Sequence, residues 1–173
     1  GARNSWSARL LAERAWADYH LGKPAIALGE QALAQQQQIG GEMSRDYQRI
    51  IGILVNIYNG SGNVERALAL QQRGVQLGAL TPGYSEGDRL MDRYNLARSR
   101  FSTGDMRGLE GDLRELTPQL EKHFGARHDR SIVTVGLWAQ TLARVGRFDE
   151  AVTLQRGNLE RVMARTPVDD ELV

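Results

Sequence analysis

The arginines are the residues with the most evident chemistry in this 173-residue chain. Of its 22 basic residues, all except Lys23 and Lys122 are arginine. A guanidinium can hold a carboxylate through two parallel hydrogen bonds, which an ammonium group cannot do. The composition therefore suits recognition of acidic groups, and a GC-rich genome is the alternative explanation.

Other side chains offer little for catalysis or metal binding. His20, His123 and His128 lack the spacing of metal ligands, and the sequence has no cysteine. It contains no phosphate-binding loop, no GxSxG motif, no HExxH motif and no readable pair of nucleophile and base. We expect no metal, no cofactor and no enzymatic activity.

Charge and hydropathy narrow the range of partners. The formal net charge is +1, so no overall field attracts nucleic acid. The longest apolar run, Ile50–Val55, contains Gly52 and is too short to span a membrane. No basic segment followed by an apolar one indicates secretion, and the absence of cysteine suits the cytoplasm. Gly1 in place of Met suggests a fragment of a longer protein.

Four glycines with similar neighbours reveal an internal repeat. Gly22, Gly62, Gly104 and Gly146 are separated by 40, 42 and 42 residues, and each lies between two apolar patterns of helical period. Glycine adopts a positive φ at a helix end without steric cost. Each glycine is therefore predicted to reverse the chain between two antiparallel helices.

Small residues five positions after these glycines predict close helix packing. Ala27, Ala67 and Ala151 occupy that position, and Leu109 departs from it. The expected helices span residues 4–20, 24–38, 43–59, 63–78, 86–102, 105–123, 129–144 and 148–164. They group into one array of four repeats, at about 3–41, 42–83, 84–125 and 126–165, with a frayed tail at 166–173.

Several local features qualify this pattern. Pro118 predicts a kink or an early break in the sixth helix. Arg14 and Asp18 stand where apolar residues are usual, so the register of the first repeat stays open. Each tryptophan lies on a helix with apolar neighbours, which predicts packing in the core or between repeats for Trp6, Trp16 and Trp138.

This pattern resembles the tetratricopeptide repeat (TPR) family. The resemblance rests on Val55, Gly62 and Ala67, on Ala139, Gly146 and Ala151, and on the segment Asn95-Leu96-Ala97. The period near 42 and the junction at 120–128 are similar to the longer-loop subgroup typified by kinesin light chain. The resemblance implies an all-α, right-handed α-solenoid whose concave surface, formed by the first helices, receives an extended peptide or a partner helix.

The family's groove positions can be carried over by counting back from each turn glycine. The resemblance then implies a peptide-binding groove containing Arg9, Trp16, Tyr19, Arg49, Asn56, Tyr94, Arg98, Phe101, Gln140 and Arg144. Asn56 matches the asparagine with which some members clamp a peptide C-terminus, and the arginines suit acidic or C-terminal carboxylate groups. Alternatively, these arginines are solvated or pair with Glu13, Asp18, Asp46 and Asp92.

The leading hypothesis is a protein-interaction module within a larger bacterial signalling or transcription-regulating protein. A second hypothesis is self-association of the array as a homo-oligomer. A third is nucleic-acid binding through an arginine-rich face, which the net charge disfavours.

Overall fold

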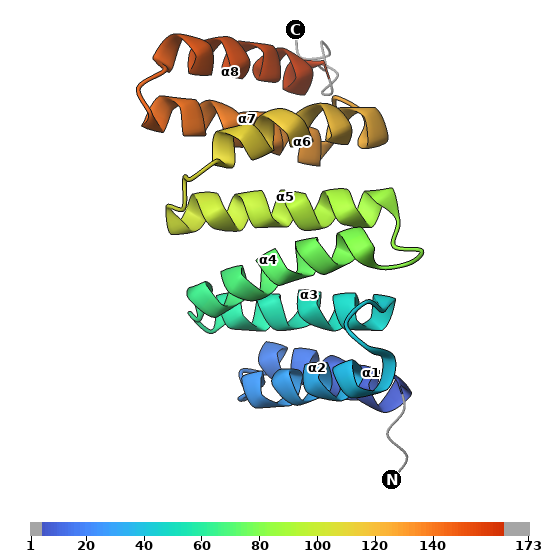
Figure 1. The fold of residues 1–173 in the computed structure, drawn as a ribbon. Coiled ribbons are helices and arrows are strands. Elements are labelled where there is room, and N and C mark those ends of the chain that lie inside the picture. The colour runs from blue at the N-terminus through green and yellow to red at the C-terminus, as the bar shows by residue number, and fades with distance from the viewer. Residues whose placement is uncertain (1–4, 165–173) are drawn as a thin grey trace, which may run out of the picture. The chain divides into compact units, whose positions relative to one another are not determined.

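The computed structural model describes residues 5–164, which form eight helices and no strand (Figure 1). The helices are α1 (Ser5–His20), α2 (Ile26–Gly40), α3 (Arg45–Gly60), α4 (Val64–Leu80), α5 (Glu86–Thr103), α6 (Leu109–Phe124), α7 (Asp129–Arg144) and α8 (Phe148–Met163). All eight were predicted, with bounds that differ by at most four residues. The predicted tail, 166–173, lies outside the described residues.

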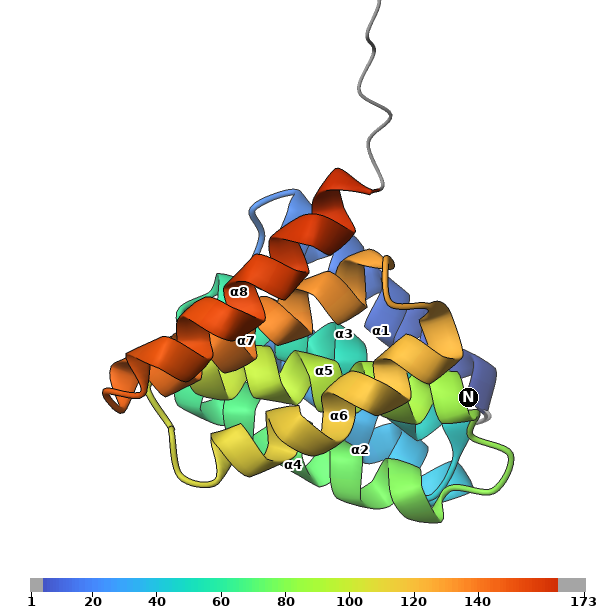
Figure 2. The same cartoon turned by 90° about the horizontal axis from the view of Figure 1, so that it is seen from above.

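Internal contacts divide the chain into two compact units. Unit 1 is Gly1–Asp92 and unit 2 is Arg93–Val173, so the boundary falls within α5. In unit 1, α1 packs on α2, α3 packs on both of these helices, and α4 packs on α3. In unit 2, α7 packs between α6 and α8 (Figures 1 and 2). Whether both units form a single array stays a prediction.

The four turn glycines adopt the backbone conformation that the repeat requires. Gly22, Gly62, Gly104 and Gly146 have φ angles of 69°, 77°, 79° and 82°. L-residues with a Cβ rarely adopt this left-handed conformation, so glycine is needed where each first helix ends. The left-handed conformation predicted for the four glycines is confirmed, and the helices on either side pack together in the pairs α1–α2, α3–α4 and α7–α8.

The packing position predicted for the first repeat is wrong. Ala67 and Ala151 are buried as expected, but Ala27 is exposed. The reason is a longer turn, because α2 begins at Ile26, four residues after its glycine, whereas α4 begins two residues after Gly62. Gly29 takes the packing position instead, and a Cβ there would lie 2.8 Å from Leu54 Cδ1.

Unit 1 is built around the apolar stripe of α3. Leu54 and Ile57 are almost fully buried, and Tyr47, Ile51 and Tyr58 extend the same stripe. Residues at i, i+3, i+4 and i+7 share one helix face, which explains how one helix contacts two neighbours. This stripe holds the first helices α1 and α3 side by side.

Unit 2 depends on the leucines of α6. Leu109, Leu113, Leu116 and Leu120 are at most 1% exposed. The helix begins at Leu109 and not at 105, because Gly108 adopts a left-handed conformation with φ 72°.

The early break expected at Pro118 is absent, since α6 continues to Phe124. Leucines on both sides of Pro118 are buried, and the Thr117 hydroxyl donates to the Leu113 carbonyl at 2.7 Å. Packing therefore outweighs the backbone hydrogen bond that proline cannot make.

The tryptophans divide into two groups. Trp16 and Trp138 are partly buried against apolar clusters, as predicted. Trp6 is 69% exposed, so its predicted packing is wrong. It lies in the first turn of α1 and faces outward, with the Arg9 guanidinium carbon 5.1 Å from its ring centroid. Across the described helices, none is both long and apolar enough to cross a membrane.

Candidate functional site

Two arginines of the predicted binding surface join α1 to α3 in unit 1. Arg9 Nε lies 3.7 Å from Asp46 Oδ1, and Arg49 Nη2 lies 2.7 Å from Glu13 Oε1. One ion pair carries its cation on α1 and the other carries it on α3. These two arginines thus have the intramolecular partners that the alternative interpretation expected. Arg49 remains 55% exposed and can still donate to another anion.

A cleft of about 350 Å³ opens beside Arg49. It is lined by Arg45, Arg49, Tyr84, Ser85 and Asp88. The Arg45 guanidinium donates to the Gly83 carbonyl, and the Ser85 hydroxyl donates to Asp88 Oδ2 at 2.6 Å. The lining residues carry two guanidinium groups and one carboxylate, so an anionic ligand that displaces Glu13 from Arg49 suits the cleft.

The sequence analysis missed most of this cleft. Arg45 and Arg49 are one helical turn apart on α3, a spacing that places both on one helix face. That signal was available from the sequence. The approach of Tyr84 and Ser85 was not, because these residues precede α5 in a loop whose path depends on packing.

Tyr84 enters the cleft as a neutral hydrogen-bond donor. Burial raises the pKa of Tyr84, and the nearby Asp92 carboxylate raises it further. The Tyr84 hydroxyl donates to Asp92 Oδ2 at 2.8 Å. Burial also raises the pKa of Asp92 above its ordinary value, with a further contribution from Asp88.

An aromatic group lies along the C-terminal part of α1. Trp16 and Tyr19 stack with centroids 5.8 Å apart, and His20 meets the Trp16 ring edge-on at 4.3 Å. Trp16 and Tyr19 also pack against the cluster of Ala15, Ala25 and Ile57. Both rings are partly buried, so each contributes to packing between the first two repeats and stays partly accessible at the surface.

Asn56 is exposed on α3 and bonds to its own helix. Its Nδ2 donates to the Gly52 carbonyl at 2.9 Å. An amide nitrogen carries two hydrogens, so Asn56 can keep this bond and still donate to a peptide carbonyl.

In unit 2, the predicted residues form two cation–π contacts. Arg144 of α7 lies over the Phe101 ring of α5 at 4.0 Å, and its Nη1 donates to the Phe101 carbonyl at 3.4 Å. Arg98 lies over the Tyr94 ring at 5.6 Å. Tyr94 is only 7% exposed, so the Arg98 guanidinium lies against a ring that is mostly buried. Gln140 is exposed on α7.

His123 and His128 take part in aromatic packing and in helix capping. His123 and His128 flank the Phe124 ring, at centroid distances of 4.5 and 5.1 Å. His128 Nδ1 accepts from the Arg130 backbone N–H at 3.2 Å and so caps the start of α7. Within residues 5–164, no three His, Asp or Glu side chains gather as a metal-binding set.

Searches by sequence give no relative. No family model matches the chain, and no curated protein matches it. The chain does resemble solved structures. One is a Podosopora anserina protein of the kinesin light chain type with nearly identical TPR-like repeats. It matches 93% of this chain and 77% of its own, with 22% identity and a TM-score of 0.76.

Two further structures share this architecture. BtubC (BKLC) from P. vanneervenii has a TM-score of 0.68 and 16% identity, and the match covers 88% of this chain and 58% of that one. A Rap protein complexed with Competence and Sporulation Factor has a TM-score of 0.65 and 17% identity, over 92% of this chain and 43% of that one. The chain therefore has the helical-repeat fold of TPR-like proteins, as predicted.

Proposed function

We propose that this chain is a protein-interaction module that binds a peptide or partner protein on the first-helix faces of its repeats. The cleft beside Arg49 carries this proposal, because it combines two guanidinium groups with an exposed position on α3. A carboxylate from a partner, either an acidic side chain or a C-terminus, suits such a cleft. Exposed ion pairs contribute little stability, so Arg49 can exchange Glu13 for a partner at small cost.

The TPR-like fold supports an interaction role and not catalysis. Repeat arrays present extended surfaces more readily than enclosed, water-free pockets. Rap, which shares the fold, was solved in complex with Competence and Sporulation Factor. By the same resemblance we propose that the chain serves a larger bacterial signalling or transcription-regulating protein and acts in the cytoplasm.

A binding selection tests the first-helix faces. A library of random linear peptides displayed on phage would be selected on the chain, and the recovered peptides would be synthesised and titrated. Replacing Arg49, Asn56 and Arg98 together by Ala should weaken binding at least tenfold, since each removes a side chain that can donate to a carboxylate or carbonyl.

The control variant must remove the same charge, two arginines and one amide side chain, from other surfaces of the chain. Arg127, Arg156 and Gln72 are exposed and lie outside the first helices, so their joint replacement by Ala should leave affinity unchanged. Helicity and melting temperature should stay near wild type in both variants. If the Arg49, Asn56 and Arg98 variant binds as tightly as its control, the first-helix faces do not bind these peptides.

Self-association is a second candidate, which exposed apolar side chains on α8 favour. Phe148, Val152 and Leu159 are exposed beside a groove of about 410 Å³ between α7 and α8. Burying such a face against a second copy would remove apolar surface from water. Sedimentation at increasing concentration tests this candidate, and Leu159→Glu should abolish any dimer that uses this groove.

A further inference from the structure

Helix α8 leaves a stripe of mostly apolar side chains uncovered. Phe148 is 64% exposed, Val152 is 49% exposed and Leu159 is 59% exposed. With Gln155 they follow one another at spacings of four, three and four residues, which places all four on one helix face. This set, the α8 stripe, borders the groove of about 410 Å³ between α7 and α8.

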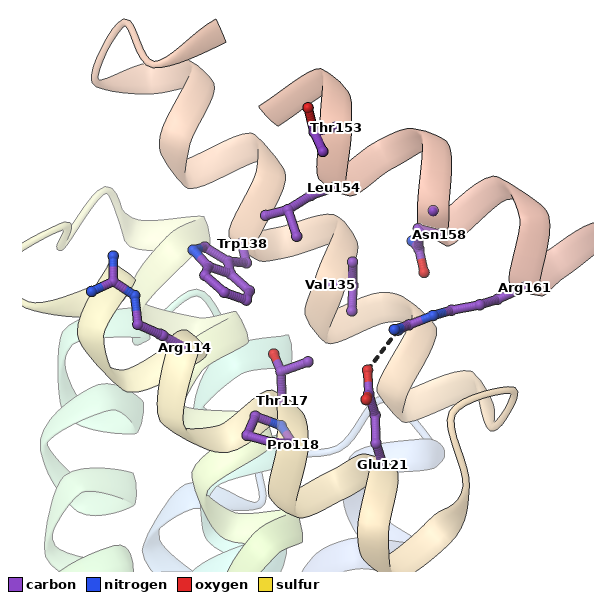
Figure 3. A pocket seen from close by; sticks show the side chains of 11 residues that line it. Arg114, Thr117, Pro118, Glu121, Val135, Trp138, Thr153, Leu154, Asn158 and Arg161 are labelled. Carbon is purple, nitrogen blue, oxygen red and sulfur yellow. Dashed lines mark hydrogen bonds and ion pairs between the residues drawn. The ribbon is translucent and has the colours of Figure 1, made fainter. Parts of the chain in front are cut away.

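The adjacent side of α8 is already in use within unit 2. Figure 3 shows Leu154, Asn158 and Arg161 directed from α8 toward α7 and α6. The Asn158 Nδ2 donates to the Ile132 carbonyl of α7 at 3.0 Å, and Arg161 Nη1 lies 2.6 Å from Glu121 Oε1 of α6. These contacts hold the helix in one rotation and leave the α8 stripe on the outside of unit 2.

Helices α2 and α6 show what lies on the equivalent face elsewhere in the chain. In each helix, four residues at relative positions 0, 3, 4 and 7 line a groove against the helices that follow. Those of α2 face α3 and α4, and those of α6 face α7 and α8 (Figure 3). The three equivalent sets are Glu30, Leu33, Ala34 and Gln37 in α2, Arg114, Thr117, Pro118 and Glu121 in α6, and Val152, Gln155, Arg156 and Leu159 in α8.

The uncovered set is more apolar than the two covered sets. Leu33 is the one branched aliphatic residue in the covered sets, whereas the set of α8 contains Val152 and Leu159 and is extended by Phe148. A repeat whose outer face meets water needs polar side chains there. The α8 stripe therefore has the character of a surface that a further helix covers.

Helix α1 of another copy does not suit this surface. The position eight residues before the turn glycine faces the preceding second helix, as Leu54 does where it meets Gly29 of α2. In α1 that position holds Arg14, whose side chain is 73% exposed and lies 3.6 Å from Asp18. Stacking α8 of one copy on α1 of the next would bury this ion pair against apolar side chains, which is costly.

The charges beside the α8 stripe suit a second α8 that runs antiparallel. Asp149 and Arg156 are seven residues apart and lie on the same edge of the stripe. Both are exposed, and neither side chain has an ion-pair partner among residues 5–164. In an antiparallel pair with a two-fold axis, Asp149 of each copy can lie opposite Arg156 of the other. A parallel pair would hold these charges about 10 Å apart along the helix axis.

We propose that a second copy of this chain covers the α8 stripe, with the two α8 helices antiparallel about a two-fold axis. Phe148 of each copy packs against Leu159 of the other, and Asp149 pairs with Arg156 on both sides of the axis. Such an interface uses the same patch on both copies and closes at a dimer. The proposal rests on self-association, the second candidate function above, and is independent of peptide binding at the first-helix faces.

A charge exchange tests the orientation of the two helices. In sedimentation over a wide range of concentrations, the wild-type chain should pass from monomer to dimer and form nothing larger. Asp149→Arg and Arg156→Glu should each weaken the dimer at least tenfold, because each places like charges opposite one another twice. An equimolar mixture of the two variants should dimerise about as well as wild type, since both contacts of the mixed dimer join opposite charges.

The mixture also shows that both variants are folded, because misfolded chains would not recover the dimer. Glu65→Arg is the matched control for Asp149→Arg. Both acidic residues lie three positions after a turn glycine, in the first turn of a second helix, and Glu65 is exposed on α4. Glu65→Arg should therefore leave dimer formation unchanged.

The outcomes separate this interface from the other proposals. A wild-type chain that stays monomeric at every concentration would overturn both self-association and this interface. Assemblies that grow beyond a dimer, or a dimer that the mixture of charge variants does not restore, would overturn the antiparallel α8 contact alone. The Arg49, Asn56 and Arg98 variant should dimerise like wild type, and Leu159→Glu should keep its affinity for the selected peptides, so the first-helix faces are tested separately.

Discussion

Asp92 and Tyr84 form a partly buried acid pair in which one carboxylate carries a desolvation cost. Because burial raises the pKa of Asp92, the native state holds its proton at pH values where the unfolded chain, with a pKa of about 3.9, has released it. The native state then binds more protons than the unfolded state. Stability should therefore fall as pH rises from the unfolded pKa through the raised native pKa.

Asp92→Asn should remove this cost and keep an oxygen that accepts from the Tyr84 hydroxyl. We expect a higher melting temperature than wild type at pH 7, and no difference near pH 3, where the carboxyl is protonated in both states. Thermal unfolding followed by circular dichroism at both pH values measures the effect. Glu160→Gln removes one exposed carboxylate and should show no such gain; an equal gain there would indicate a change in overall charge.

Some residue contacts could be foreseen from the sequence, and others could not. The alternative interpretation paired the groove arginines with Glu13, Asp18, Asp46 and Asp92, and Arg9–Asp46 and Arg49–Glu13 are two pairs from that set. Asn158 was missed, although it stands 12 positions after Gly146, where the second repeat has Gly74, 12 after Gly62. Comparing repeats position by position would have shown a polar residue in place of a glycine.

At the scale of the helix, α6 tolerates an internal proline. Pro118 lacks an N–H, so the Arg114 carbonyl loses its usual helical partner. The helix is retained because Leu116 and Leu120, on either side, are buried in the core of unit 2. The stability of α6 thus comes from packing more than from backbone hydrogen bonds.

Pro118→Ala should stabilise the protein, because it restores a backbone donor at an exposed position. We expect an increase of about 1–3 kcal/mol in the free energy of unfolding, measured by urea titration. Pro82→Ala, in the exposed loop before α5, should give no increase, since a loop proline restricts the unfolded chain. A loss of stability in Pro118→Ala would mean that α6 needs the proline for its packing.

The helix bounds were predictable because turn glycines and apolar periodicity are local signals. Deviations occurred where residues that precede a helix were predicted to belong to it. Lys23-Pro24-Ala25 delays α2, and Gly108 delays α6. The choice between turn and helix in these segments depends on the core that each helix must reach, which the local pattern does not contain.

At the scale of the molecule, each of the two compact units buries apolar side chains of its own. Leu54 is buried in unit 1 between α2, α3 and α4, whereas Leu116 is buried in unit 2. In repeat proteins each segment is stabilised mainly by its neighbours, so local opening can be confined to one part of the chain.

Leu54→Ala should reduce stability by about 2–5 kcal/mol, as expected for a large buried side chain. Native-state hydrogen exchange should accelerate for amides in α1–α4 and change little in α6–α8. Leu116→Ala is the reciprocal variant and should accelerate exchange in α6–α8. Equal acceleration throughout the chain in both variants would show that the protein opens only as a whole.

The number of repeats and the class of the fold followed from four glycines and their spacing. The grooves did not follow, because each is bounded by side chains from at least two helices. Their volumes depend on which side chains happen to be small at the meeting point, as Gly157 and Thr117 are in unit 2. Sequence periodicity predicts which helices are neighbours and leaves the space between them undetermined.

The placement of the tryptophans gives the protein its own optical reporters. Trp16 is partly buried in unit 1, Trp138 is partly buried in unit 2, and Trp6 is exposed. Replacing Trp6 by Phe would leave one indole fluorophore in each unit. Trp138 would then report changes in the packing of unit 2, and Trp16 would report changes in unit 1, without any attached dye.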